Sequence, residues 1–165
     1  MARVYGFSAY DGNLALKVSP TLWLAVLFLM RPYVIMILSF ADRRDRMALI
    51  EMFYADRLPM VFASIAALPV IIFFASYLKR SKAQNVLWAR RLWHKGRELL
   101  MLSAALNVLV VFFPYLLDQH HKLTLIGMIQ LLVSLIVLLF LARSQRVKDT
   151  FADYPTPGEP DTRSG

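Results

Sequence analysis

Residues 21–41 read TLWLAVLFLMRPYVIMILSFA and contain a single charged side chain, Arg31. A helix that crosses the hydrocarbon core of a bilayer needs about 20 mostly apolar residues, because its backbone must satisfy its own hydrogen bonds there. The stretch has this length and composition, and about twenty residues precede it, which is unlike a cleavable signal peptide. It therefore predicts a membrane-spanning helix that stays in the mature protein.

Three more stretches of the same kind follow, at about residues 59–78, 99–117 and 123–142, and none contains an acidic residue. The chain has 165 residues and is 58% hydrophobic, so no soluble shell remains to cover four such helices. We expect an all-α polytopic membrane protein with a bundle of four transmembrane helices. Residues 1–145 would form this single transmembrane domain, and residues 146–165 a cytoplasmic tail, largely disordered.

The basic residues predict the orientation. The chain carries 19 Lys and Arg against 11 Asp and Glu, a net charge of +8. If the N-terminus is inside, 13 basic residues fall on the inner side and 5 in the outer loops. Because positive charge resists translocation, both termini are expected in the cytoplasm.

Residues 82–97, KAQNVLWARRLWHKGR, mix aromatic, aliphatic and basic side chains at roughly helical spacing. This pattern is typical of an interfacial helix whose tryptophans lie among the lipid headgroups. We therefore expect an interfacial basic helix between the second and third spans. Its candidate contacts with anionic lipid are Trp88, Arg90, Arg91, Trp93, Lys95 and Arg97. Simple anchoring explains the same residues, and that alternative stays open.

The outer segment, residues 42–58, balances four basic against four acidic residues. The favoured interpretation is a connecting loop that neutralises its own charge. Its apolar residues leave a short helix on the outer membrane face as the alternative.

Arg31 is the sharpest single feature, since an arginine in mid-span costs at least about 2.5–3.5 kcal/mol. No acidic residue lies within the four spans, so its partners must be neutral acceptors. The candidates are the amide oxygens of Asn107 and Gln130, carbonyls freed by a proline, and hydroxyls such as those of Ser39, Ser64, Ser103, Ser134 and Tyr33. Residue counting places Arg31 and Asn107 near mid-span and Gln130 a little toward the outer side, so one intramembrane polar cluster of Arg31, Asn107 and Gln130 is geometrically possible. It could hold an anion or a lipid headgroup, or it could only join helices.

No catalytic, cofactor or metal site is expected. The chain has no cysteine, and its spans contain no acidic residue or histidine for proton transfer, haem ligation or hydrolysis. His120 and His121 lie near Asp118, but adjacent side chains do not share a helix face. We therefore expect a protein that is not an enzyme, and no nucleic-acid partner.

Small side chains in the second and third spans allow another helix to approach closely. They are Ala63, Ser64, Ala66, Ala67, Ser103, Ala104 and Ala105. They favour an accessory or scaffold subunit whose partners are membrane lipids and another membrane protein or a second copy. The alternative is a small transporter or a lipid- or anion-binding protein that uses the Arg31 cluster.

One further pattern links the first two spans. It consists of Asp11-Gly12-Asn13-Leu14, Pro20, Leu22-Trp23, Arg31 and Phe53-Tyr54-Ala55-Asp56. It resembles the YfeZ-like family of bacterial inner-membrane proteins, which is catalogued as a domain of unknown function. The resemblance covers about residues 11–69 and implies a four-helix inner-membrane protein with no established activity. It also implies that Trp23, Arg31, Asp11 and Asp56 belong to one pattern.

Overall fold

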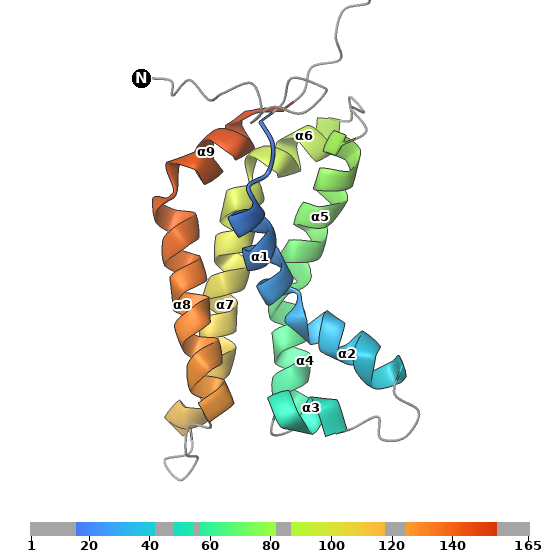
Figure 1. The fold of residues 1–165 in the computed structure, drawn as a ribbon, viewed down its shortest axis with the longest axis vertical. Coiled ribbons are helices and arrows are strands. Elements are labelled where there is room, and N and C mark those ends of the chain that lie inside the picture. The colour runs from blue at the N-terminus through green and yellow to red at the C-terminus, as the bar shows by residue number, and fades with distance from the viewer. Residues whose placement is uncertain (1–15, 42–47, 55–56, 82–86, 118–124, 155–165) are drawn as a thin grey trace, which may run out of the picture.

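The computed structural model describes residues 16–41, 48–54, 57–81, 87–117 and 125–154, except the side chains of residues 48, 57, 81 and 113–117. Helices make up nearly all of these residues (Figure 1). Their order is α1 (Pro20–Leu29), α2 (Arg31–Ala41), α3 (Ala48–Phe53), α4 (Arg57–Ala66), α5 (Leu68–Ser81), α6 (Leu87–His94), α7 (Gly96–Leu117), α8 (Leu125–Arg143) and α9 (Gln145–Ala152). The expectation of an all-α chain is confirmed for this part of the protein.

Within the described residues, the chain follows the long axis of the molecule in α1, in α4 with α5, in α7 and in α8, whereas α2 runs obliquely to that axis (Figure 1). It descends through α1 and α2, returns through α4 and α5, descends through α7 and returns through α8, which packs along α7. The first and last described segments meet at one end, where the amide of Leu16 donates to Asp153 Oδ2 at 2.7 Å. This agrees with two ends on one side of a membrane.

Two helices in the described residues are long and apolar enough to cross a bilayer, namely Leu58–Arg80 and Leu125–Arg143. The pair α1 and α2 would make a third if it forms one bent span. The helix α7 has 22 residues. The count of four spans therefore stays a prediction.

The surfaces of these helices are apolar on the outside as well as within the bundle. Leu24, Ile37, Phe40 and Leu132 are each 60% exposed or more. A helix with apolar residues all round belongs in an apolar solvent, because water would penalise this surface.

The first predicted span is two helices rather than one, and they are bent by 62° at Met30. Pro32 has no amide hydrogen, so the carbonyl of Phe28 loses its normal partner four residues on. The bend turns α2 away from α7 and α8 (Figure 1).

A second break separates α4 from α5 at Ala67, two residues before Pro69. The amide of Val70 bonds to the carbonyl of Ala67 at 3.0 Å, which leaves the carbonyl of Ala66 free of its helical partner. The hydroxyl of Ser103 on α7 donates to that carbonyl at 2.7 Å.

The contact between α4 and α7 also accounts for the small residues that the sequence analysis singled out in the second and third spans. Ala63, Ala66 and Ala67 are buried, as are Ser103 and Ala104 on α7. They let α4 and α7 approach within the protein, so they are not free to receive a partner helix.

An aromatic core closes the end where α6 and α9 lie (Figure 1). Phe73, Trp93 and Phe151 are buried, with ring centroids 5.0–5.8 Å apart. Phe73 and Trp93 stack, whereas Phe151 meets the ring of Phe73 edge-on. The indole of Trp93 donates to the carbonyls of Thr150 and Asp153 at 3.1 and 3.0 Å. Prediction of a largely disordered tail from residue 146 is therefore wrong as far as Asp153, because α9 buries Val147 and Phe151. Residues 155–165 lie outside the described part.

The outer segment also differs from the favoured prediction. Ala48–Phe53 forms the helix α3 rather than a plain loop. Leu49 and Ile50 pack against a small core made by Ile35, Tyr54 and Ala63, which is a tertiary reason for the helix to form.

Candidate functional site: a buried cationic centre

Arg31 begins α2 at the bend, and its side chain reaches both α7 and α8. Its Nη2 donates to Asn107 Oδ1 at 2.7 Å and to Gln130 Oε1 at 3.3 Å. Asn107 is fully buried and Gln130 is 7% exposed. The structure thus brings together the three polar residues that the sequence places at similar depth.

The bend supplies Arg31 with its other contacts. Arg31 Nη1 lies 3.5 Å from the carbonyl oxygen of Phe28, the one that Pro32 leaves without its usual amide. The guanidinium carbon also lies 4.4 Å from the centre of the Phe28 ring. A cation over a ring face is attracted by its quadrupole. Pro32 therefore frees the carbonyl of Phe28 at the bend, and Arg31 supplies a donor to it.

The two amides must both turn their oxygens to Arg31, because a guanidinium can only donate hydrogen bonds. Their nitrogens then point elsewhere. Gln130 Nε2 donates to the carbonyl of Phe53 at 3.4 Å, which ties α8 to the end of α3. Asn107 Nδ2 is buried and has no acceptor in the described part of the chain.

Tyr54 is a member of the site that physical reasoning from the sequence did not single out. It directly follows α3, is 5% exposed and packs with Ile35 and Ala63. Burial raises the pKa of the Tyr54 phenol, and the nearby Arg31 charge opposes that rise. Hydrogen bonding between the Tyr54 hydroxyl and the Arg31 side chain also opposes the rise of this pKa, and the hydroxyl bonds to no other described side chain or backbone atom. Tyr54 did stand in the Phe53-Tyr54-Ala55-Asp56 pattern that carries the family resemblance. Nothing in the sequence spacing of that pattern, however, indicated a contact between Tyr54 and Arg31.

We refer to Arg31, Tyr54, Asn107 and Gln130 as the polar centre. Within the described residues, Arg31 meets two amide oxygens, one carbonyl and one aromatic ring, and no carboxylate. Its Nε is buried without an acceptor there. The polar centre therefore holds a positive charge that the described neighbours stabilise by dipoles alone.

The predicted lipid contacts lie on α6, at Lys95 and at Arg97 near the start of α7, and they divide into two groups. Trp88, Arg90, Arg91 and Lys95 are exposed and remain candidates for contact with anionic lipid. Trp93 and Arg97 do not fit that expectation. Trp93 is fully buried in the aromatic core, and Arg97 Nε and Nη2 donate to the carbonyls of Leu141 and Ala142 at 2.9 and 2.8 Å. The two bonds from Arg97 cap the end of α8, whose last carbonyls have no helical partner.

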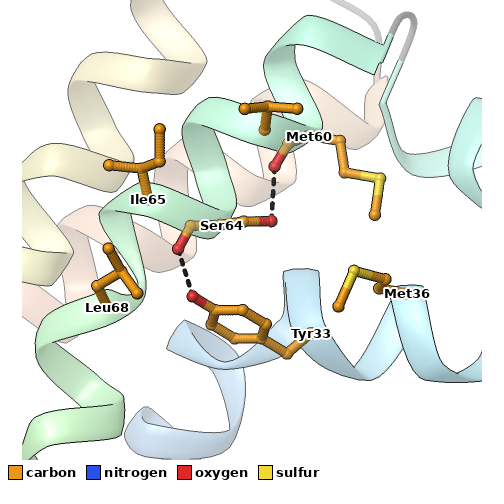
Figure 2. A pocket seen from close by; sticks show the side chains of 7 residues that line it. Tyr33, Met36, Met60, Ser64, Ile65 and Leu68 are labelled. Atoms are coloured by element: carbon orange, nitrogen blue, oxygen red, sulfur yellow. Dashed lines mark hydrogen bonds between the residues drawn. The ribbon is translucent and has the colours of Figure 1, made fainter.

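An apolar groove of about 300 Å³ separates α2 from α4. In Figure 2, Tyr33 Oη donates to the carbonyl of Ser64 at 2.7 Å, and Ser64 Oγ donates to the carbonyl of Met60 at 2.9 Å. Met36, Ile65 and Leu68 line the rest, with Val61. Because the hydroxyls of Tyr33 and Ser64 both donate to backbone carbonyls, the groove offers a ligand apolar contacts but no unused polar side chain.

The predicted histidine pair, His120 and His121, lies outside the described residues with Asp118. In the part of the chain that the structure describes, no three His, Asp or Glu side chains form a group that could hold a metal ion.

Comparison with known proteins gives a family but no chemistry. The family model described as "Protein of unknown function (DUF2919)" matches residues 5–153. The protein "Inner membrane protein YfeZ" of Escherichia coli (strain K12) is 24% identical over 142 residues, which is 86% of this chain and 90% of that protein. No solved structure matches the chain. The resemblance stated from the sequence is confirmed.

Proposed function

This chain belongs to the DUF2919 family of proteins of unknown function, and from that premise we propose that it binds an anionic group at the polar centre within the bacterial inner membrane. It acts without catalysis and needs no cofactor. The inner-membrane location rests on its apolar helices and on the name of its relative in Escherichia coli.

The observation that carries this proposal is the Arg31 charge, which the described residues leave without a counter-charge. Ionisable residues at membrane depth are costly and normally face a partner, a pathway or a ligand. An anion supplies the missing negative charge and converts this cost into binding affinity.

The proposed topology has four spans, with α1 and α2 forming one of them and α7 another. Both termini lie in the cytoplasm, since the described ends meet at the end that carries α6. The exposed Arg90, Arg91 and Lys95 support this orientation, because basic residues stay on the inner side. They also support contact of α6 with anionic lipid.

The decisive variant is Asn107→Asp. Asn107 Oδ1 already lies 2.7 Å from Arg31 Nη2, so an aspartate would supply the counter-charge from within the chain. The matched neutral variant is Asn107→Leu, which is similar in size and leaves the Arg31 charge unpaired.

Binding is measured as thermal stabilisation of the full chain in neutral detergent, with sodium acetate titrated at constant ionic strength. We expect acetate to stabilise the parent protein most and to bind Asn107→Leu more weakly, because the Asn107 Nδ2 donor is lost. Asn107→Asp should bind acetate more weakly again by at least about tenfold, a change of about 1.4 kcal/mol, because it also adds the counter-charge. Equal acetate binding by the parent and Asn107→Asp, or no binding by the parent, would refute the proposal.

A second function, accessory subunit of a membrane complex, is favoured by a different observation. The bend turns α2 away from α7 and α8, and Ile37, Leu38 and Phe40 on it are 52–69% exposed. Such a projecting helix can pack against a partner protein or a second copy. Extraction into a lipid-preserving polymer, followed by native mass spectrometry, should show a stoichiometric partner that Ile37→Asn weakens. A chain that is always alone would exclude this role.

A further inference from the structure

Three buried side-chain atoms of the polar centre have donor capacity that no described atom takes up, apart from the interaction between the Arg31 and Tyr54 side chains. They are Arg31 Nε, Asn107 Nδ2 and Tyr54 Oη, carried by α2, α7 and the residue after α3. Buried polar groups almost always find partners, because an orphaned one loses its bond to water without return. Three such donors in one cluster point to an acceptor-rich ligand.

The charge of the polar centre limits what this ligand can be. Arg31 contributes one positive charge, and its described hydrogen-bond partners are all neutral. A ligand with one negative charge leaves the buried site neutral. A ligand with two would leave a net negative charge in a medium of low dielectric constant, which is strongly penalised.

The geometry of the guanidinium limits the ligand further. Nη1 and Nη2 are already engaged with Phe28, Asn107 and Gln130. These contacts use three of the five guanidinium N–H groups, so Arg31 can offer only Nε–H and one Nη1–H to a ligand. The remaining hydrogen bonds must come from Asn107 and Tyr54, which makes both residues determinants of specificity.

We infer, on the basis of the anion site proposed above, that the polar centre takes a singly charged oxyanion and that Tyr54 is one of its three donors. A carboxylate and the phosphodiester of a phospholipid headgroup share this chemistry. Tyr54 binds the ligand from the side of α3, and the bond from Gln130 to the carbonyl of Phe53 holds α3 in place for it.

The variant that tests the role of Tyr54 is Tyr54→Phe, which removes the hydroxyl and keeps the ring that packs on Ile35 and Ala63. Its matched control is Tyr33→Phe. The Tyr33→Phe variant also loses one tyrosine hydroxyl from the region of α2 and α4, but in the parent protein that hydroxyl already donates to the carbonyl of Ser64. We expect acetate to bind Tyr54→Phe about tenfold more weakly, since a bond to an ionised group is lost, and to bind Tyr33→Phe like the parent protein.

The charge of the ligand is tested with two pairs of probes. In detergent, sodium acetate should stabilise the parent protein and sodium sulfate at equal ionic strength should not. In neutral detergent with no other phospholipid, added phosphatidylglycerol supplies a phosphodiester and added phosphatidic acid a phosphomonoester. Retention of phosphatidylglycerol over phosphatidic acid in native mass spectra, lost in Tyr54→Phe, identifies a lipid source. Acetate binding without retained lipid identifies a soluble carboxylate.

Failure of this inference is distinguishable from failure of the proposed function. If acetate and sulfate bind equally, or if Tyr54→Phe binds acetate like the parent, the anion site stands and the inference falls. If no anion binds the parent protein, both fall, and the polar centre holds water only. Asp56 lies outside the described residues, but it is only two residues from Tyr54 in the sequence, so its carboxylate needs a test of its own. If Asp56→Asn creates acetate binding that the parent lacks, the chain supplies its own carboxylate, and the inference is overturned.

Discussion

Gly96, the first residue of α7, lies where a side chain would strike the ring of Phe151. A Cβ built at Gly96 would lie 2.4 Å from Phe151 Cε1 and 2.8 Å from Cδ1. Nonbonded carbon atoms prefer about 3.5–4.0 Å, so the ring or α7 must shift by about 1 Å. The ring has little freedom, since Phe151 is 3% exposed and packs between Phe73 and Trp93.

The variant Gly96→Ala should therefore destabilise the protein. Overpacking a core costs about 1–3 kcal/mol. Alanine returns at most about 1 kcal/mol of helix propensity, and less at the first residue of a helix. The net loss of about 1–2 kcal/mol corresponds to a fall in melting temperature of about 2–8 °C for a chain of this size. The melting temperature is measured by heating the protein in neutral detergent and recording, at each temperature, how much of the folded peak remains on size exclusion.

Phe151→Leu provides the internal check, because the smaller side chain makes room for the added methyl group. Each single variant should melt below the parent protein, and the double variant Gly96→Ala/Phe151→Leu should lose at least about 1 kcal/mol less than the sum of the two. A Gly96→Ala melting temperature at or above that of the parent, or strict additivity, would refute this account of the packing.

Three more outcomes are expected. Ser103→Ala removes the hydrogen bond from α7 to the carbonyl of Ala66 and should lower the free energy of unfolding by about 0.6–1.7 kcal/mol. Ser64→Ala should cost less, because the Ser64 hydroxyl bonds within its own helix, and the melting temperatures of the two variants test this order. Trp93→Phe keeps the ring but loses both bonds to α9, so limited proteolysis should cut the C-terminal segment faster than in the parent; an unchanged rate would mean that these bonds do not hold α9. A fluorescent reporter after Gly165 should be active in the cytoplasm and a phosphatase at His120 should be active outside; the reverse pattern would overturn the orientation.

Depth in the membrane made part of the site predictable. A span of fixed length fixes the level of each residue, so Arg31, Asn107 and Gln130 were expected at similar depth, and the structure joins them at 2.7 and 3.3 Å. The need of a buried guanidinium for acceptors was also predictable. Tyr54 was not, because it reaches the site from a connecting segment whose path depends on how α3 packs against α2 and α4.

The amphipathic pattern of residues 82–97 shows the limit of the sequence more sharply. It correctly indicated a helix there, which the structure has at Leu87–His94. An indole is driven out of water equally well by lipid and by protein, so the pattern could not tell the two destinations of its tryptophans apart. Trp88 stays exposed, whereas Trp93 enters the aromatic core with Phe73 and Phe151.

The sequence by itself determined that the chain is rich in helix, that its long helices are apolar and that a cation lies among them. Backbone satisfaction and transfer free energy are local properties of each stretch, which is why they could be read from it. Tertiary structure alone decided the direction of the 62° bend, the use of the small residues between α4 and α7, the order of α9 and the entry of Tyr54. Each of these depends on which of several equally apolar or polar neighbours comes within contact distance. Only the packed chain specifies that neighbour.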